Sequence, residues 1–257
     1  MSIALLALLF LLTALLYSSV GFGGGSTYIA LLVLGGMALE EVPVIALACN
    51  IAVVTTSTLR FAREGLVEWR QIVPLVALSV PFAWLGGFLP VPAWLFVGLL
   101  AVALLAASLL MILQRDRAGN RVSHPAKRPG IDMVSGAALG LLAGVTGIGG
   151  GIYLSPLLHL RRWAEARRIA ATCAVFILVN SAAGIAGHAS RLGLAETGEI
   201  LSRNALLFPA VIVGGLAGST LGARWISQRH LRLLTALLVL YVAVRLGLRF
   251  PAEWAAR

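Results

Sequence analysis

Long apolar runs, interrupted by short polar or glycine-rich stretches, fill most of the chain. Residues 1–39, 71–114 and 169–187 contain no charged side chain. Because about 20 apolar residues suffice for a helix to cross a bilayer, this pattern predicts an all-α polytopic membrane protein. We expect helices or short helical limbs over residues 2–20, 26–37, 42–59, 72–89, 92–113, 133–146, 152–160, 169–187, 204–223 and 233–249. Pro90-Val91-Pro92 predicts a tight reversal between two of them, since proline cannot continue a helix.

The two halves of the chain resemble each other. The motif GFGGG at 21–25 recurs as GIGGG at 147–151, each between an apolar segment and a short apolar limb. A small polar cluster follows in each half, and the span that carries it ends in a basic or histidine-containing stretch, at 60–66 and at 188–194. We therefore divide one membrane transport domain, 1–257, into a first repeat at 1–113, a polar linker at 114–130 and a second repeat at 131–257.

The distribution of basic residues predicts the topology. Most of the 20 lysines and arginines lie in connections at 60–70, 114–130, 161–168 and 224–232, whereas 38–41 and 89–92 contain none. The positive-inside rule makes the first set cytoplasmic and the second external, with the N-terminus outside. We treat residues 188–203 as an external loop. Each glycine-rich unit must then enter the membrane and return on the same side.

The return limbs are too short to span the membrane. Ten helical residues cover about 15 Å, against a hydrocarbon core of about 30 Å. We therefore expect each unit to be a re-entrant helix pair that is broken at its glycines. With three further transmembrane helices per half, the chain has about eight membrane helices, and the two repeats are inverted. This is a common architecture of secondary transporters.

The paired glycine motifs are the candidate binding site. Glycine permits close backbone approach, so each motif can present bare N–H groups at the start of the next limb. A helix N-terminus carries about half a positive charge, so two converging ends would bind an anion. The predicted substrate-binding residues are Gly21, Gly23, Gly24, Gly25, Ser26, Thr27, Cys49, Asn50, Gly147, Gly149, Gly150, Gly151, Ile152, Thr172, Cys173 and Asn180. The competing interpretation is that the glycines only permit tight packing and the polar groups only join helices.

Other glycines indicate packing faces. Gly136, Gly140 and Gly144 repeat every four residues, and so do glycines 214, 218 and 222. This small-xxx-small spacing predicts close contact with a neighbouring helix.

Composition narrows the function. Hydrophobic residues make up 60% of the chain, charged residues only 12%, and the mean hydropathy is +0.95, so a soluble enzyme is excluded. The net charge of +10 is spread over loops, which argues against a nucleic-acid partner. Two cysteines inside apolar segments form no metal pattern, and no cofactor motif is present. The expected partners are a small anion and the lipid bilayer, and a homo-oligomer remains open.

Arg60 and His188 occupy matching helix ends. They are candidates for gating the cytoplasmic and external openings of a transport pathway. His188 is also a candidate for carrying a proton. Interfacial snorkelling is the alternative. A secondary transporter for a small anion is the leading functional hypothesis, with an anion channel as the second. An intramembrane hydrolase with Ser26 as nucleophile and His188 as base is a third, weaker one.

The sequence resembles the TauE/SafE family of sulfite-exporter-like membrane proteins. GFGGGSTYIALLVLGG at 21–36, GVTGIGGGIYLSPLLHL at 144–160, the two polar clusters and a loop at 188–193 carry the resemblance. It implies a multi-pass permease of the bacterial inner membrane for sulfite, sulfonates, thiosulfate or other small organic anions. Family members often have Thr-Ser in both clusters, where this chain has Cys49-Asn50 and Thr172-Cys173, so the substrate is the least determined part of this prediction.

Overall fold

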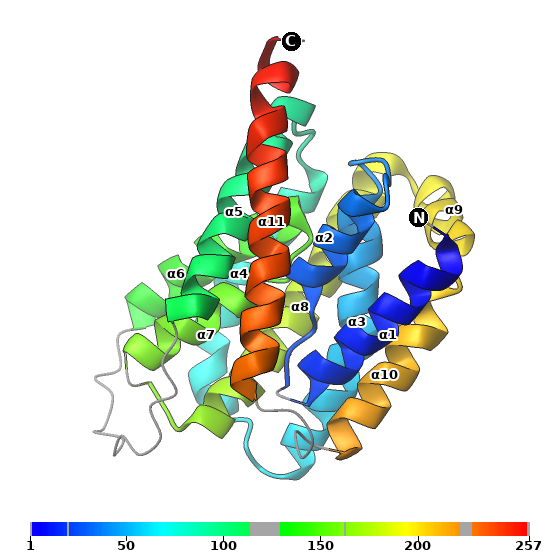
Figure 1. Cartoon of the computed structure of the whole chain (residues 1–257). Coiled ribbons are helices and arrows are strands. Elements are labelled where there is room, and N and C mark those ends of the chain that lie inside the picture. The colour runs from blue at the N-terminus through cyan, green and yellow to red at the C-terminus, as the bar shows by residue number, and fades with distance from the viewer. Residues whose placement is uncertain (1, 20, 114–128, 162, 222–227, 256–257) are drawn as a thin grey trace.

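A computed structural model describes residues 2–19, 21–113, 129–161, 163–221 and 228–255 (Figure 1). These residues form helices and no strand, which confirms the all-α class. The helices are α1 Ile3–Ser18, α2 Gly25–Leu34, α3 Val42–Arg63, α4 Trp69–Phe88, α5 Ala93–Leu113, α6 Pro129–Thr146, α7 Gly151–Leu160, α8 Ala166–Leu192, α9 Leu194–Arg203, α10 Leu207–Leu221 and α11 Gln228–Ala255. Most of the predicted linker, 114–128, lies outside the described residues.

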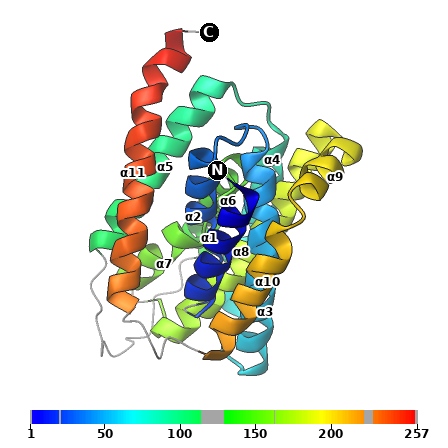
Figure 2. The same ribbon diagram turned by 45° about the vertical axis from the view of Figure 1, so that its right-hand side comes forward.

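Several helices are long and apolar enough to cross a membrane. In the described part of the chain, α3, α4, α5 and α8 meet this test. α9 and α10, which are bent by 70° at their junction, pass the test only together and make a fifth candidate span if the pair is counted as one. The protein is therefore a multi-pass membrane protein, and the count of eight membrane helices stays a prediction. Figure 2 shows α9 at the edge of the bundle above α10.

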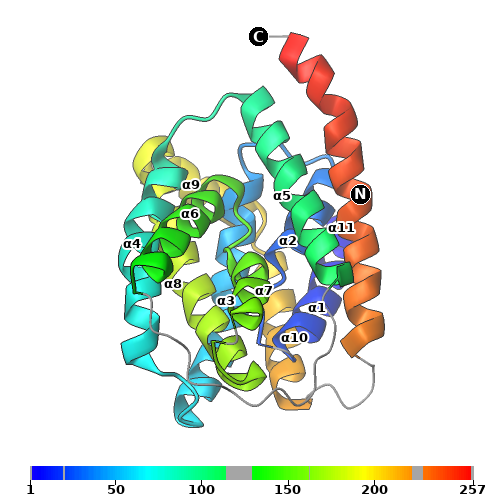
Figure 3. The same cartoon turned by 90° about the vertical axis from the view of Figure 1, so that its left-hand side faces the viewer.

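The short limbs predicted after the glycine motifs are present as α2 and α7, of 10 residues each. Figures 1 and 3 show that they start inside the bundle and run toward opposite ends, α2 upward and α7 downward. All residues of α2 from Gly25 to Leu32 are buried. These limbs are therefore interior elements enclosed by the longer helices.

Glycine faces hold two helix pairs in close contact, as the four-residue spacing predicts. A Cβ atom at Gly140 of α6 would lie 2.2 Å from the carbonyl oxygen of Ser79 on α4, and Gly136 and Gly144 meet α4 in the same way. On the other side, Gly214 and Gly218 of α10 lie against carbonyl oxygens of α1. Position 222 lies outside the described residues. Without side chains on one face, the two backbones in each pair can touch.

Ion pairs show which connections share an end of the bundle. Arg167, in the first turn of α8, contacts Glu64 after α3 at 2.7 Å, and Arg168 contacts Glu68. At the opposite end, Arg203 contacts Glu41 at 3.1 Å. The described parts of the connections at 60–70 and 161–168, both predicted to be cytoplasmic, therefore meet at one end, the lower one in Figure 1, away from the α2–α3 connection. Which end faces the cytoplasm stays a prediction.

One sequence expectation is wrong. Residues 188–203, predicted as a loop, are helical: α8 continues to Leu192, and α9 follows after Gly193. Polar residues end the apolar run at Gly187, but α8 continues through the buried His188, whose Nε2 atom lies 3.0 Å from the carbonyl oxygen of Gly144. Gly193, with φ +95°, then turns the chain into α9, which buries only Thr197 and Ile200. The predicted reversal at 90–92 is confirmed, between α4 and α5.

Gly140→Ala tests the close α4–α6 contact. The new methyl group would force the two backbones apart, so we expect a loss of stability of about 1–3 kcal/mol, despite the higher helix propensity of alanine. Thermal unfolding of the purified protein in detergent measures the loss. Gly247→Ala in α11, where nothing lies within 4 Å of the new Cβ, is the matched control and should not lower the melting temperature. Equal melting of both variants would contradict the packing role.

Candidate functional site

The two glycine loops, residues 21–24 and 147–150, meet in the interior. A Cβ atom at Gly25, the first residue of α2, would lie 2.4 Å from the carbonyl oxygen of Ile148. Only glycine fits there, because the obstacle is backbone and cannot move aside like a flexible side chain. The start of α2 is therefore in direct contact with the loop that leads into α7, as the sequence hypothesis requires.

Both loops end in a left-handed glycine. Gly24 precedes α2 with φ +82°, and Gly150 precedes α7 with φ +77°. Neither N-terminus has a side-chain cap. The left-handed conformation suits glycine because no Cβ atom opposes it. As a result, the first amide groups of both helices are exposed to the interior of the site and not covered by a capping side chain.

These amide groups have no hydrogen-bond partner among the described residues. The set comprises the backbone N–H groups of Gly23, Gly24, Gly25, Ser26, Gly149, Gly150, Gly151 and Ile152. All but Ile152 belong to buried residues. Buried backbone donors are nearly always paired, so eight donors at two adjoining helix N-termini form an unusual concentration of unmet hydrogen-bonding capacity. The partial positive charge of each helix N-terminus adds to the attraction of these donors for a negatively charged acceptor.

Asn50 of α3 lies between the two loops. Its amide nitrogen donates to the carbonyl oxygens of Gly147 and Ile148, at 3.5 and 3.4 Å. Its amide oxygen lies toward Gly23, where a Cβ atom would be 2.6 Å away. This oxygen is buried and has no hydrogen-bond partner in the described structure. Asn50 thus links the first repeat to the loop of the second and leaves one acceptor unused.

The second loop faces different side chains. A Cβ atom at Gly149 would lie 3.0 Å from Ile177 and 3.3 Å from the hydroxyl oxygen of Ser181, both on α8. The Ser181 hydroxyl is buried, and the described residues offer it no partner. Sequence reasoning missed Ser181, although it follows the predicted Asn180 directly. Helical spacing alone could not show which of these two neighbours faces the loop.

Other predicted site residues make contacts of their own. The hydroxyl oxygens of Thr27 and Tyr17 lie 3.0 Å apart, and the sequence reasoning missed Tyr17. Thr172 donates back to Arg168 at 2.9 Å, and Asn180 to Phe176 at 2.8 Å, both within α8. Gly21 lies against the ring of Phe61.

The two cysteines pack into apolar clusters. Cys49 lies with residues of α2 and α3, and Cys173 with Leu154 and Phe176. The structure therefore concentrates the candidate site on the two loops and Asn50. Their part in binding, like that of every residue predicted for the site, stays a prediction.

Arg60 and His188 each connect helices. Arg60 donates to the carbonyl oxygen of Ser219 on α10 and lies over the ring of Phe61, 4.9 Å from its centroid. His188 is buried, and its Nε2 atom lies 3.0 Å from the carbonyl oxygen of Gly144 on α6. Both residues thus have interhelical contacts that a purely interfacial side chain would lack, and a gating role for either stays a prediction.

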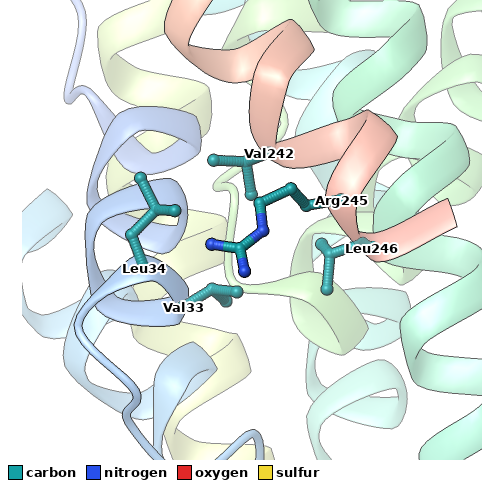
Figure 4. Close-up of a pocket in the computed structure, with 5 residues that line it drawn as sticks. All are labelled: Val33, Leu34, Val242, Arg245 and Leu246. Atoms are coloured by element: carbon teal, nitrogen blue, oxygen red, sulfur yellow. The ribbon is translucent and has the colours of Figure 1, made fainter. Parts of the chain in front are cut away.

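A small cavity lies apart from the loops, between α2 and α11 (Figure 4). Val33, Leu34, Val242, Arg245 and Leu246 line it. The guanidinium of Arg245 points toward the last turn of α2. Apart from Arg245 the lining is aliphatic, so the donors of this cavity come from one cationic side chain and not from backbone N–H groups as at the glycine loops.

Comparison with known proteins agrees with this architecture. Residues 6–246 match the family described as "Sulfite exporter TauE/SafE". The chain belongs to the TauE/SafE family. It is 32% identical over 249 residues to a probable membrane transporter protein of Sinorhizobium fredii, which covers 94% of this chain and 96% of the relative. A probable membrane transporter protein of Methanocaldococcus jannaschii is 25% identical over 187 residues, 69% of this chain and 68% of that protein. No solved structure matches.

The family description and the names of both relatives indicate a membrane transporter. The family assignment made from the glycine motifs is thereby confirmed.

Asn50→Ala tests the link between α3 and the second loop. Losing the amide leaves two buried carbonyl oxygens unpaired, so we expect a loss of stability of about 1–3 kcal/mol. Ser57→Ala is the matched control on the same helix, because that hydroxyl is buried without a partner and its removal should cost little. Denaturation of both variants in detergent gives the comparison. If Asn50→Ala is as stable as the wild type, the two long hydrogen bonds do not hold the loop.

Proposed function

We propose that this protein is a secondary transporter that moves a small anion by alternating exposure of a site at the two glycine loops. The substrate class is sulfite, sulfonates or other small organosulfur or organic anions. The observation that carries the proposal is the set of eight N–H groups at the adjoining N-termini of α2 and α7 that have no partner among the described residues. Such donors bind an oxyanion without a cationic side chain, as other helix N-termini do.

The helix contacts support two inverted repeats around this site. α4 packs on α6 as α10 packs on α1, and α8 contacts α4 as α3 contacts α10. α3 and α8, like α5 and α11, pack on each other. Each of these contacts is thus repeated when α1, α2, α3, α4 and α5 are exchanged with α6, α7, α8, α10 and α11, respectively. The matching helices run in opposite directions in Figures 1 and 3.

The loop contacts follow the same exchange. Gly23 faces Asn50 and Val54 of α3, and Gly149 faces Ile177 and Ser181 at the corresponding places on α8. In the proposal, rocking of one repeat against the other would expose the shared site first to one side and then to the other. The basic connections would face the cytoplasm of a bacterial inner membrane, with the N-terminus outside. Arg60 and His188 would tie helices at opposite ends of the bundle.

Transport by loop variants tests the site. Gly24→Leu and Gly150→Leu each place a side chain next to the amide groups of the loops. We therefore expect sulfite flux into proteoliposomes to fall by about tenfold or more, which corresponds to a loss of ~1.4 kcal/mol in the stabilisation of the bound anion. Gly36→Leu is the control, because Gly36 has φ +80° and nothing within 4 Å of its Cβ position. It shares the backbone strain without touching the site, and its flux should stay near that of the wild type.

Three results would argue against the proposal. Unchanged flux in both loop variants, with correct insertion, would remove the loops from the site. Anion current that rises with concentration without saturating would indicate a channel. Absence of flux for every sulfur oxyanion tested, with a known anion transporter as positive control, would reject the substrate class.

A further inference from the structure

We infer that the site selects a monovalent oxyanion that carries its own hydrogen-bond donor, over a dianion and over an anion without a donor. The inference rests on the proposed function and deepens it. It comes from the juxtaposition of two helix N-termini with a buried amide oxygen, that of Asn50, which has no partner in the described structure.

Charge selects a monoanion. The side chains that lie nearest the glycines of the two loops are neutral: Thr13, Tyr17, Tyr28, Asn50, Val54, Phe61, Phe176, Ile177 and Ser181. None of these neighbours is cationic, so the positive charge that directly adjoins the loops is that of the N-termini of α2 and α7, about half a unit each, or about one unit together. This balances one negative charge. A second charge would lose its hydration without a matching partner, and burial of uncompensated charge is strongly unfavourable.

Hydrogen bonding selects an anion with a donor. The N–H groups of both loops and the Ser181 hydroxyl can donate to substrate oxygens, but the Asn50 amide oxygen can only accept. An anion whose outer atoms are all acceptors would face this oxygen lone pair to lone pair and leave it unpaired. A substrate with one O–H or N–H group would satisfy it. Leaving a buried acceptor without a partner costs about 1–3 kcal/mol.

Asn50 cannot simply turn its amide around. Its nitrogen is engaged by the carbonyl oxygens of Gly147 and Ile148, so rotation would place oxygen against oxygen and lose both contacts. The oxygen is thus held toward Gly23. The matching position on α8 is Ile177, which has no polar atom. Among the side chains nearest the loop glycines, Asn50 is thus the one that supplies an amide oxygen, and this acceptor calls for one donor on the substrate.

Three probes of the same tetrahedral shape test the inference: sulfamate, methanesulfonate and sulfate. Sulfamate is a monoanion with an N–H donor, methanesulfonate has a methyl group in its place, and sulfate has a second charge. Binding to the purified full-length protein is measured by calorimetry at constant pH and ionic strength. We expect sulfamate to bind about tenfold more tightly than methanesulfonate, as one hydrogen bond to an otherwise unpaired buried acceptor would give, and sulfate to bind more weakly than both.

Variants assign the preference to its residue. Asn50→Leu keeps the volume and removes the acceptor, so sulfamate and methanesulfonate should bind it equally. Ser181→Ala should weaken all three probes by a similar factor, and Ser57→Ala, on the same helix as Asn50 but not among the residues nearest the loop glycines, should leave their affinities unchanged. Gel filtration and thermal unfolding show whether each variant is folded. If Asn50→Leu is not folded, the affinities of the wild-type protein for the three probes decide whether the inference holds.

The outcomes separate this inference from the proposed function. If sulfate binds as tightly as sulfamate, or methanesulfonate equals sulfamate in the wild type, the inference is wrong while an anion site stands. If none of the three probes binds and sulfite flux is absent, both the inference and the proposed function fail.

Discussion

The structure depends on one constraint, that backbone amide groups inside a membrane protein must find partners. Long helices satisfy it within themselves, which is why α3, α4, α5 and α8 can form the frame. The short limbs α2 and α7 violate it locally, because each starts inside the bundle and leaves its first N–H groups unpaired. Irregular backbone at such a depth is tolerated where protein encloses it or where it lines a polar site. Here the two irregular segments lie together and share one neighbour, Asn50.

Close packing is what makes that meeting possible. The glycine faces of α6 and α10 let these helices touch the backbones of α4 and α1, so the outer helices form two tight pairs. Gly25 does the same at the centre, where the start of α2 touches Ile148. Glycine therefore has two distinct roles in this chain. On long helices it brings backbones together, and in the loops it also leaves the first amide groups of α2 and α7 without a capping side chain.

The site is symmetric in its backbone and asymmetric in its side chains. Both loops end in a left-handed glycine before a ten-residue helix, yet Asn50 on one side is matched by Ile177 on the other, and Val54 by Ser181. Two repeats that only had to pack against each other would gain nothing from this difference. A site that must hold a ligand with chemically distinct atoms uses it, because donors and an acceptor then occupy separate places around one centre.

The sequence by itself determined the all-α membrane class, the two short limbs, the glycine packing faces and the family. Each of these depends on local pattern: apolar length, a glycine repeat, or a motif that occurs twice. Tertiary structure decided the rest. Asn50 and Ser181 face the loops, whereas Asn180 bonds within its own helix and the two cysteines pack into apolar clusters, because the rotation of α3 and α8 about their axes is set by packing. The apolar pattern likewise did not reveal that residues 188–203 are helical: α8 runs on through His188, which contacts the carbonyl of Gly144, and α9 follows after Gly193.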